Sequence, residues 1–219
     1  MGQVVILVEG QTEEKLVNEV LSPAVSMRGT YVTPVVVTTS ATPTGAHHGG
    51  GHWKHYHAQL QALLKASHWH RVGLLLDYYQ YPKGAPGREV ATPSESLDSA
   101  GRQAGLMAAL RAEYPDPRFR PLVVLHEIEA LVLAAIDAGQ GDGLLPRQGL
   151  AELRQAITRA GGPERVNDGP STAPSKRLEA ADPGYMKTVI GPQLVSDAGL
   201  PAVLERCPTF KDWWDDLLA

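Results

Sequence analysis

Residues 3–15, QVVILVEGQTEEK, decide the fold class of this chain. The apolar residues 4–8 predict a strand that is buried on both faces, which is typical of parallel sheets between helices. Glu9 and a glycine follow this strand, and Thr12 is a candidate cap for a helix with Glu13 in its first turn. A strand, a turn and a helix in this order predict an α/β sheet, in which ligands bind at the carboxyl ends of the strands.

Length and composition set limits on the function. The 219 residues suit one well-buried core with a smaller attached part. The net charge of -4 does not mark the whole chain as a polyanion binder, although a local basic cluster and a divalent cation can hold phosphates at negative mean charge. The one cysteine, Cys207, excludes an internal disulfide and a thiolate-rich metal site, and we expect it to be a buried apolar residue.

No stretch of the sequence has the features of a membrane segment. No run approaches the roughly 20 apolar residues that span a bilayer, and the first residues lack the basic-then-apolar order of a signal peptide. We therefore expect a cytoplasmic protein without a membrane partner.

Strand and helix patterns alternate through residues 1–138, which we expect to form the core. Pro34 favours an edge position for the second strand, and Ser22-Pro23 is expected to end the first helix. Alternation of this kind predicts a Rossmann-like α/β fold, a four-stranded parallel sheet flanked by helices with right-handed crossovers. Strands are predicted at 4–8, 31–38, 72–76 and 122–125, and helices at 13–24, 52–67, 97–114 and 130–138.

Residues 139–219 are predicted to form a helical C-terminal extension packed on the core. Trp213 and Trp214 are expected to seal the last helix onto the core; if they are exposed instead, they mark a partner interface. Helices are predicted at 149–160, 175–181, 185–198 and 210–217.

Carboxylates end three of the predicted strands. Asp77 follows the third strand as Glu9 follows the first, and Glu127 and Glu129 follow the fourth. A parallel sheet brings these strand ends to one rim, where crowded carboxylates persist most naturally around a divalent cation. Hard oxygen ligands favour Mg²⁺ or Mn²⁺. One acid after a buried strand is more often a cap or a loop residue, but three such acids predict a metal site.

Several short motifs occur in an order and spacing that resemble a known family. They are VEGQTEE at 8–14, LLLDYYQYP at 74–82, HEIEALVLA at 126–134, APSKRL at 173–178, YMK at 185–187 and CPTFKDWWDDL at 207–217. Together they resemble a Toprim-like family of formerly unknown function, related to the overcoming-lysogenisation-defect nucleases. Its members often sit beside ABC-type or overcoming-lysogenisation-defect-like ATPases in bacterial defence operons. The resemblance covers nearly the whole chain.

The resemblance implies a Toprim fold in which Glu9 and Asp77 bind Mg²⁺ for phosphodiester chemistry. It also implies that Glu13 is the second acid of a Glu-x-x-x-Glu pattern. One position departs from the family pattern, because Tyr79 stands where the second acid of Asp-x-Asp is usual, and this weakens a two-metal assignment.

A third acid is expected from the end of the fourth strand. Glu127 or Glu129 occupies a plausible third-acid position and could replace the missing ligand. On a helix, residues two apart point about 200° from each other, so both would face one ion only if the helix starts between them. We favour Glu127, which is nearer the strand.

Basic residues follow Pro174, at a point where a helix is expected to start. Ser175, Lys176 and Arg177 there would suit a phosphate, because exposed backbone N–H groups and cations attract it. In the related nucleases a late lysine assists catalysis, so the resemblance implies this role for Lys176 and, less directly, Lys187. The alternative is a solvated basic helix start.

Histidines cluster around a glycine-rich stretch, residues 39–51, that is predicted to be a loop. A zinc site needs ligands three or four residues apart on a helix, and only His48 with His52 and His52 with His55 offer that spacing. We prefer a polar loop to a zinc site. The clustered histidines are His47, His48, His52, His55 and His57.

Two further groups near the predicted rim have open roles. His126 precedes Glu127 and is either a proton shuttle or a structural histidine. Tyr78, Tyr79 and Tyr81 either stack on bases or pack the loop after the third strand, and packing is favoured.

The leading hypothesis is a Mg²⁺-dependent nuclease that cuts DNA or RNA, with tRNA among the candidates, as the effector of an ATPase-associated anti-phage defence system. Its expected partner is an ABC-type or overcoming-lysogenisation-defect-like ATPase subunit, and a homo-oligomer is left open. One alternative is a non-catalytic Toprim-like subunit that binds or regulates within an ATPase complex. A weaker alternative is a zinc hydrolase built on the histidines.

Overall fold

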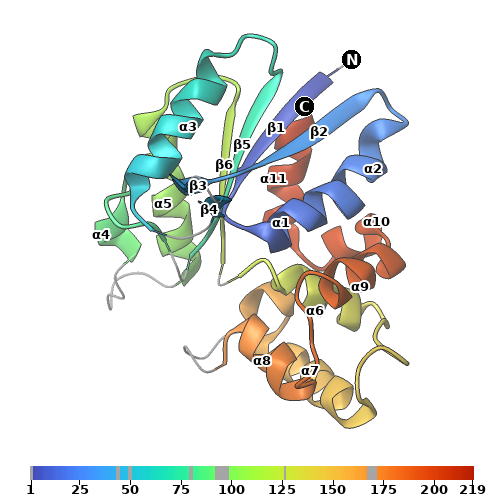
Figure 1. Cartoon of the computed structure of the whole chain (residues 1–219). Coiled ribbons are helices and arrows are strands. Elements are labelled where there is room, and N and C mark those ends of the chain that lie inside the picture. Colours follow the sequence, from blue (N-terminus) through green and yellow to red (C-terminus); the bar gives the residue numbers. More distant parts are fainter. Residues whose placement is uncertain are drawn as a thin grey trace. The chain divides into compact units, whose positions relative to one another are not determined.

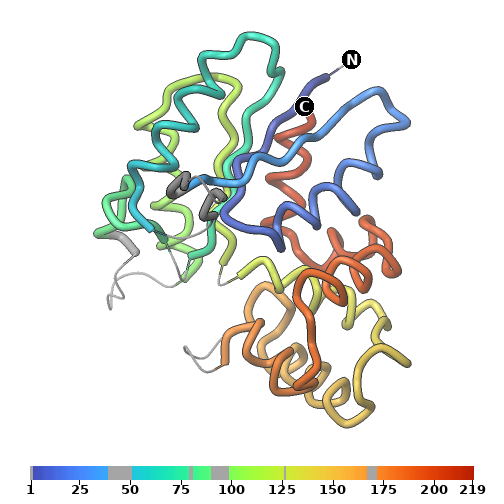
Figure 2. Tube along the Cα trace, viewed as in Figure 1, coloured from blue at the N-terminus to red at the C-terminus, as the bar shows by residue number. Residues whose placement is uncertain are grey.

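The computed structural model describes residues 2–42, 45–48, 51–78, 81–91, 99–125, 127–166 and 172–219, without the side chains of 39–48 and 90–91 (Figures 1 and 2). The described residues form two compact units. The first unit combines Met1–Leu125 with Trp213–Ala219, and the second is His126–Asp212. Among the described helices, none is long and apolar enough to cross a membrane.

A parallel sheet forms the centre of the first unit. Its four described strands are β1 (Gly2–Val8), β2 (Thr30–Val36), β5 (Arg71–Asp77) and β6 (Phe119–Val124), in the order β2-β1-β5-β6. The apolar runs 4–8 and 72–76 are the buried central strands, as their composition predicts. Pro34 lies in one outer strand and Pro121 in the other, where a missing N–H donor is tolerated. The predicted α/β fold and the edge position of Pro34 are confirmed.

Helices cover both faces of this sheet (Figure 1). On one face α3 (Trp53–Lys65) and α5 (Ser99–Glu113) pack against the sheet, and their apolar residues form one core with alternate residues of β1 and β5. A side chain at Gly73 would meet Trp213 Cζ2 at 3.3 Å, so the end of α11 (Pro208–Leu218) packs closely on the other face. Both Trp213 and Trp214 are buried, which confirms that they seal the last helix. The short helix α4 (Arg88–Ala91) precedes α5.

The first helix continues beyond its predicted end. It consists of α1 (Gln11–Leu16), a π-helical turn (Val17–Leu21) and α2 (Ser22–Ser26). The prediction that Ser22-Pro23 ends this helix is wrong. Pro23 lies in the first turn of α2, after the wide turn, where a backbone N–H is not needed for the regular hydrogen-bond pattern.

A small hairpin occupies part of the predicted glycine-rich loop. β3 (Thr38–Thr42) pairs antiparallel with β4 (Gly45–His48), so the prediction of a loop is wrong for these residues. The threonines of β3 have the β-branched side chains that favour strands. The rest of 39–50 lies outside the described residues.

The described part of the second unit is helical, as predicted for the C-terminal region. It contains α6 (Ala130–Asp137), α7 (Arg147–Ala160), a 3-10 turn (Pro163–Arg165), α8 (Pro174–Ala181), α9 (Ile190–Ala198), α10 (Leu200–Leu204) and the start of α11. The predicted helix at 185–198 begins only at Ile190, since turns precede it. Cys207 is fully buried, as expected. The boundary expected after residue 138 falls inside this unit, directly after α6.

Candidate functional site

Glu9 and Asp77 lie at the carboxyl ends of the two central strands. β1 ends at Val8, directly before Glu9, and Asp77 is the last residue of β5. Leu7 pairs with Leu74, so Glu9 reaches the level of the residue before Asp77. Both acids are half-buried. The sheet therefore brings these two predicted ligands to neighbouring strand ends.

Tyr56 of α3 lies on the face of the sheet to which Glu9 belongs. Val5 and Leu7 share a core with Tyr56, and Glu9 continues their alternation along the strand. The Tyr56 ring is fully buried and stacks on Trp53, with ring centroids 5.7 Å apart. Packing thus fixes the ring close to the end of β1.

Burial and three acids of the first unit act on the hydroxyl of Tyr56. Burial raises the pKa of Tyr56, and the carboxylates of Glu9, Asp77 and Glu13 raise it further, with a hydrogen-bonding contribution from Glu9. This hydroxyl forms no hydrogen bond of normal geometry with the described residues. Both observations fit a hydroxyl directed toward Glu9 but outside the ideal range. All three predicted acids of the first unit therefore influence this one buried phenol, Glu9 most strongly.

Glu13 holds the start of α1. Its Oε2 accepts a hydrogen bond from the Gly10 N–H at 3.0 Å, in the manner of a capping box. Gly10 is the N-cap residue, so the prediction of Thr12 as the cap is wrong. A side chain at Gly10 would meet Glu13 Oε2 at 3.3 Å, and the turn after Glu9 is therefore tight. The role of Glu13 as a metal ligand stays a prediction.

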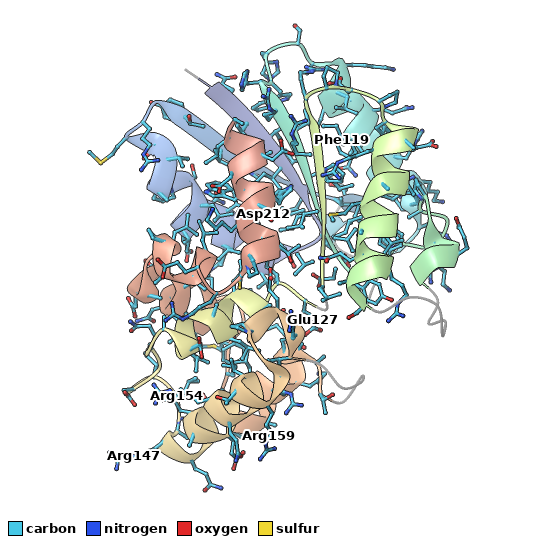
Figure 3. The ribbon with its side chains drawn as sticks, turned by 180° about the vertical axis from the view of Figure 1, so that it is seen from behind. Phe119, Glu127, Arg147, Arg154, Arg159 and Asp212 are labelled. Atoms are coloured by element: carbon cyan, nitrogen blue, oxygen red, sulfur yellow. The ribbon has the colours of Figure 1, made fainter. Side chains whose placement is uncertain are left out.

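Glu127 and Glu129 belong to the second unit, where both precede α6 (Glu127 is labelled in Figure 3). Glu127 Oε2 accepts a hydrogen bond from the Ser175 N–H at 2.8 Å, at the start of α8. A carboxylate thus occupies the helix N-terminus at which a phosphate was predicted. Glu129 is only 4% exposed, and its Oε1 lies 3.1 Å from Lys187 Nζ.

The charges of this second group are coupled. Burial raises the pKa of Glu129, and Glu127 raises it too, whereas Lys187 acts in the opposite direction. Burial alone would lower the pKa of Lys187, but the carboxylates of Glu129, Glu127 and Glu179 raise it above its ordinary value. Glu127 and Glu129 therefore lie close to each other, and α6 starts after both of them rather than between them.

The basic residues of α8 are engaged on the surface. Pro174 opens the helix, which confirms the predicted start. Lys176 Nζ lies 2.7 Å from Glu179 Oε2, and Arg177 Nε donates to the Thr172 carbonyl at 2.9 Å. The phosphate-binding roles of Ser175, Lys176, Arg177 and Lys187 and the catalytic role of Lys176 stay predictions. Other arginines of this unit that Figure 3 labels, Arg147, Arg154 and Arg159, lie on α7.

The predicted site residues form two groups, one in each unit. Glu9, Glu13 and Asp77 belong to the first unit, and the second group comprises Glu127, Glu129, Ser175, Lys176, Arg177 and Lys187. The predicted convergence of the two groups stays a prediction.

The donor set of the first unit suits a hard cation with few protein ligands. Within the described residues, no group of three or more His, Cys, Asp or Glu side chains is arranged to hold a metal ion. One oxygen of Glu13 is committed to Gly10, which leaves Glu9 and Asp77 as the pair at the strand ends. Mg²⁺ is often bound by one or two carboxylates, with waters and substrate phosphates as the other ligands. This pair fits that mode of binding.

The histidines offer no metal site in the part of the chain that the structure describes. His52 is the N-cap residue of α3, and His57 Nδ1 shares a hydrogen bond with the Tyr114 hydroxyl. The side chains of His47 and His48, and all of Tyr79 and His126, lie outside the described residues.

Two tyrosines that follow β5 have structural partners. Tyr81 is buried and its hydroxyl donates to the Pro86 carbonyl at 2.7 Å, which confirms the packing interpretation for Tyr81. The Tyr78 hydroxyl accepts a hydrogen bond from Arg102 Nε at 2.7 Å. The sequence stretch around Asp77 gave no indication of Arg102, because it lies far along the chain on α5.

A family model described as a domain of unknown function, DUF4276, matches residues 8–218. The chain belongs to the DUF4276 family. No curated protein and no solved structure matches it. The DUF4276 match includes every predicted site residue of both units, from Glu9 to Lys187. The description of DUF4276 names no activity.

Proposed function

We propose that this DUF4276 protein is a Mg²⁺- or Mn²⁺-dependent nuclease of the Toprim-like type, which hydrolyses phosphodiester bonds in DNA or RNA. The observation that supports it most is the placement of Glu9 and Asp77 at the ends of adjacent central strands, where both act on the hydroxyl of Tyr56. Carboxylates held together in this way repel each other, and a divalent cation removes that repulsion.

The chemistry requires few protein groups. A bound Mg²⁺ supplies a Lewis acid and a polarised water to the phosphodiester. Glu9 and Asp77 would hold the cation at the edge of the sheet, and Glu13 fixes the turn between Glu9 and α1. Because Glu9 and Asp77 are half-buried, their charges are screened less than charges in bulk water. We assign Glu13 to the turn rather than to the cation.

The second unit would contribute the remaining charges. In this proposal Glu127 or Glu129 is a further acid, and Lys176 offsets the charge of the transition state. Ser175, Arg177 and Lys187 would contact phosphates, which requires that the Ser175 N–H and Lys187 exchange carboxylate partners for phosphate oxygens.

The cellular role is proposed from the resemblance. The protein would act in the cytoplasm as the effector of an anti-phage defence system, with an ABC-type or overcoming-lysogenisation-defect-like ATPase as partner. An ATPase gene directly beside this one would support the assignment. A solitary gene would argue against it.

Cleavage assays with two conservative variants test the proposal. Glu9→Gln and Asp77→Asn should each reduce Mg²⁺-dependent cleavage of DNA or tRNA by at least about 100-fold, because each removes a ligand charge. Glu19→Gln is the control, since Glu19 is a half-exposed acid of the same unit that lies 4.0 Å from Lys15. Thermal melting should show that all three variants fold. Cleavage at the wild-type rate by both site variants would refute the nuclease.

A non-catalytic DUF4276 subunit is the second candidate. It is favoured by the finding that no three acids of the described residues are arranged for a metal, and by Tyr79 at the position of the family's second acid. Calorimetry with Mn²⁺ separates the two candidates. A nuclease must bind the cation, whereas absence of heat up to millimolar concentration would favour the subunit.

A further inference from the structure

Burial of the Tyr56 hydroxyl without a good hydrogen bond destabilises the folded protein. The side chain has no exposed surface, and at strict hydrogen-bond geometry the hydroxyl has no partner among the described residues. A buried hydroxyl in this state costs about 1 to 3 kcal/mol relative to one in water. A phenylalanine would fill the same space without this cost, so packing alone does not explain a tyrosine here.

Tyr56 has apolar side chains around its ring, and carboxylates are the charged groups that act on its hydroxyl. Trp53 stacks on the ring, and Leu60, one turn further along α3, belongs to the same core. Toward the strand ends the charged neighbours are the carboxylates of Glu9, Asp77 and Glu13. The ring is therefore held by packing, and Glu9, on the same face of the sheet, is the acid that contributes most to the raised pKa of its hydroxyl.

We propose that Tyr56 is a positioning residue for the divalent cation: when the ion is bound, its hydroxyl donates a hydrogen bond to the Glu9 carboxylate and holds it in the orientation that binds the ion. This inference rests on the proposed metal site. A tyrosine hydroxyl ordinarily keeps its proton at neutral pH, so it can donate to a carboxylate there. Partners of this kind, one step behind the ligand, change metal affinity by about 10- to 100-fold when they are removed.

Mn²⁺ alone is the probe for this role, added to the full-length, metal-free protein. Tyr56→Phe should weaken the affinity for Mn²⁺ by about 10-fold or more. Its melting temperature should stay the same or rise, because the variant removes a buried hydroxyl without a good partner. The electron paramagnetic resonance spectrum of bound Mn²⁺ should also change, since it reports the geometry of the ligands.

Tyr81→Phe is the matched control. Tyr81 is a buried tyrosine of the same unit, but its hydroxyl donates to the Pro86 carbonyl at 2.7 Å rather than facing the acids. The control should melt at a lower temperature than the wild type and bind Mn²⁺ with unchanged affinity. The two variants are thus expected to show opposite patterns of stability and affinity.

Three results would overturn the inference, and they have different meanings. If Tyr56→Phe binds Mn²⁺ as the wild type does, with the same spectrum, the metal site stands and the role of Tyr56 falls. If both variants weaken binding equally, the effect is general and not due to the hydroxyl. If the wild type binds no Mn²⁺, the proposed metal site fails and the inference fails with it.

Discussion

At the scale of single residues, the acids that the sequence predicts as metal ligands have different surroundings in the structure. Glu13 accepts a hydrogen bond from a backbone N–H, Glu129 pairs with Lys187, and Glu9 raises the pKa of Tyr56. A carboxylate that caps a helix or pairs with a lysine already has its charge offset. Among these acids, Glu9 and Asp77 are the two that lie at the ends of adjacent central strands, and we propose them as the cation ligands.

Glu13 provides the first test at this scale. Glu13→Ala should lower the free energy of unfolding by about 1 kcal/mol, because it removes the bond to the Gly10 N–H. Glu13→Gln keeps an acceptor for that N–H, and should retain both stability and Mn²⁺ affinity within about threefold. Urea unfolding and calorimetry measure the two quantities. A large loss of Mn²⁺ affinity in Glu13→Gln alone would show that Glu13 is a ligand instead.

The positions of Glu9 and Asp77 at the strand ends could be predicted, because each acid directly follows an apolar run that is typical of a buried strand. Tyr56 could not be predicted as their neighbour. The helical pattern of α3 marks Tyr56 only as part of an apolar face, and nothing in that pattern states where its hydroxyl lies. The cap at Gly10 was missed for a similar reason, because Thr12 is the more usual capping residue by type.

At the scale of elements, some helix ends and loops predicted from single residues are wrong, because the structure around those residues changes what they can form. Pro23 is a helix breaker by sequence, but the π-helical turn before it allows the helix to continue to Ser26. The glycines of the histidine-rich stretch favour a loop, but part of this stretch forms a hairpin, whose β-branched residues favour strands. The edge position of Pro34 could be predicted, because an edge strand tolerates the missing N–H of a proline.

Lys187 tests how the second unit holds its buried acid. Lys187→Met should destabilise the protein by about 2 kcal/mol at neutral pH, below the range for fully buried pairs because Lys187 remains partly solvated. Lys176→Met is the control: its pair with Glu179 is exposed, and the change should cost less than about 0.5 kcal/mol. Chemical unfolding measures both. Equal losses in the two variants would contradict a special role for the Lys187 pair.

The effect of Lys187→Met depends on pH in a defined direction. The pKa of Glu129 is raised in the folded protein, so its contribution to stability is complete below its ordinary value and is lost as the pH rises through the raised pKa. Without Lys187, which lowers it, that pKa rises further. The deficit of Lys187→Met relative to the wild type should therefore shrink as the pH falls toward 4. A deficit that grows in acid would contradict this.

At the scale of the whole molecule, the last helix belongs to both units. α11 begins at Pro208 within the second unit, and its final residues, from Trp213, belong to the first. The sequence predicts a helical extension after residue 138, but an amphipathic pattern shows only that a helix has an apolar face and not which element covers it. The return of Trp213 to the sheet therefore could not be predicted in detail.

Trp213 tests this return. Trp213→Ala should lower the free energy of unfolding by about 3 to 5 kcal/mol, because it empties the space beside Gly73 and removes the bond from Nε1 to the Arg120 carbonyl. Met27→Ala is the control, since Met27 is 99% exposed and should change stability by less than about 0.5 kcal/mol. Thermal melting of both variants is sufficient. A Trp213→Ala protein as stable as the wild type would contradict the packing of α11 on the sheet.

The central claim is that Glu9 and Asp77 share one divalent cation, and calorimetric titration with Mn²⁺ measures this most directly. The wild type should bind the ion at one site, and Glu9→Gln and Asp77→Asn should each weaken binding by at least about 10-fold. The double variant should bind no more tightly than either single variant, because both carboxylates hold the same ion. Absence of binding by the wild type, or wild-type affinity in either single variant, would contradict the claim.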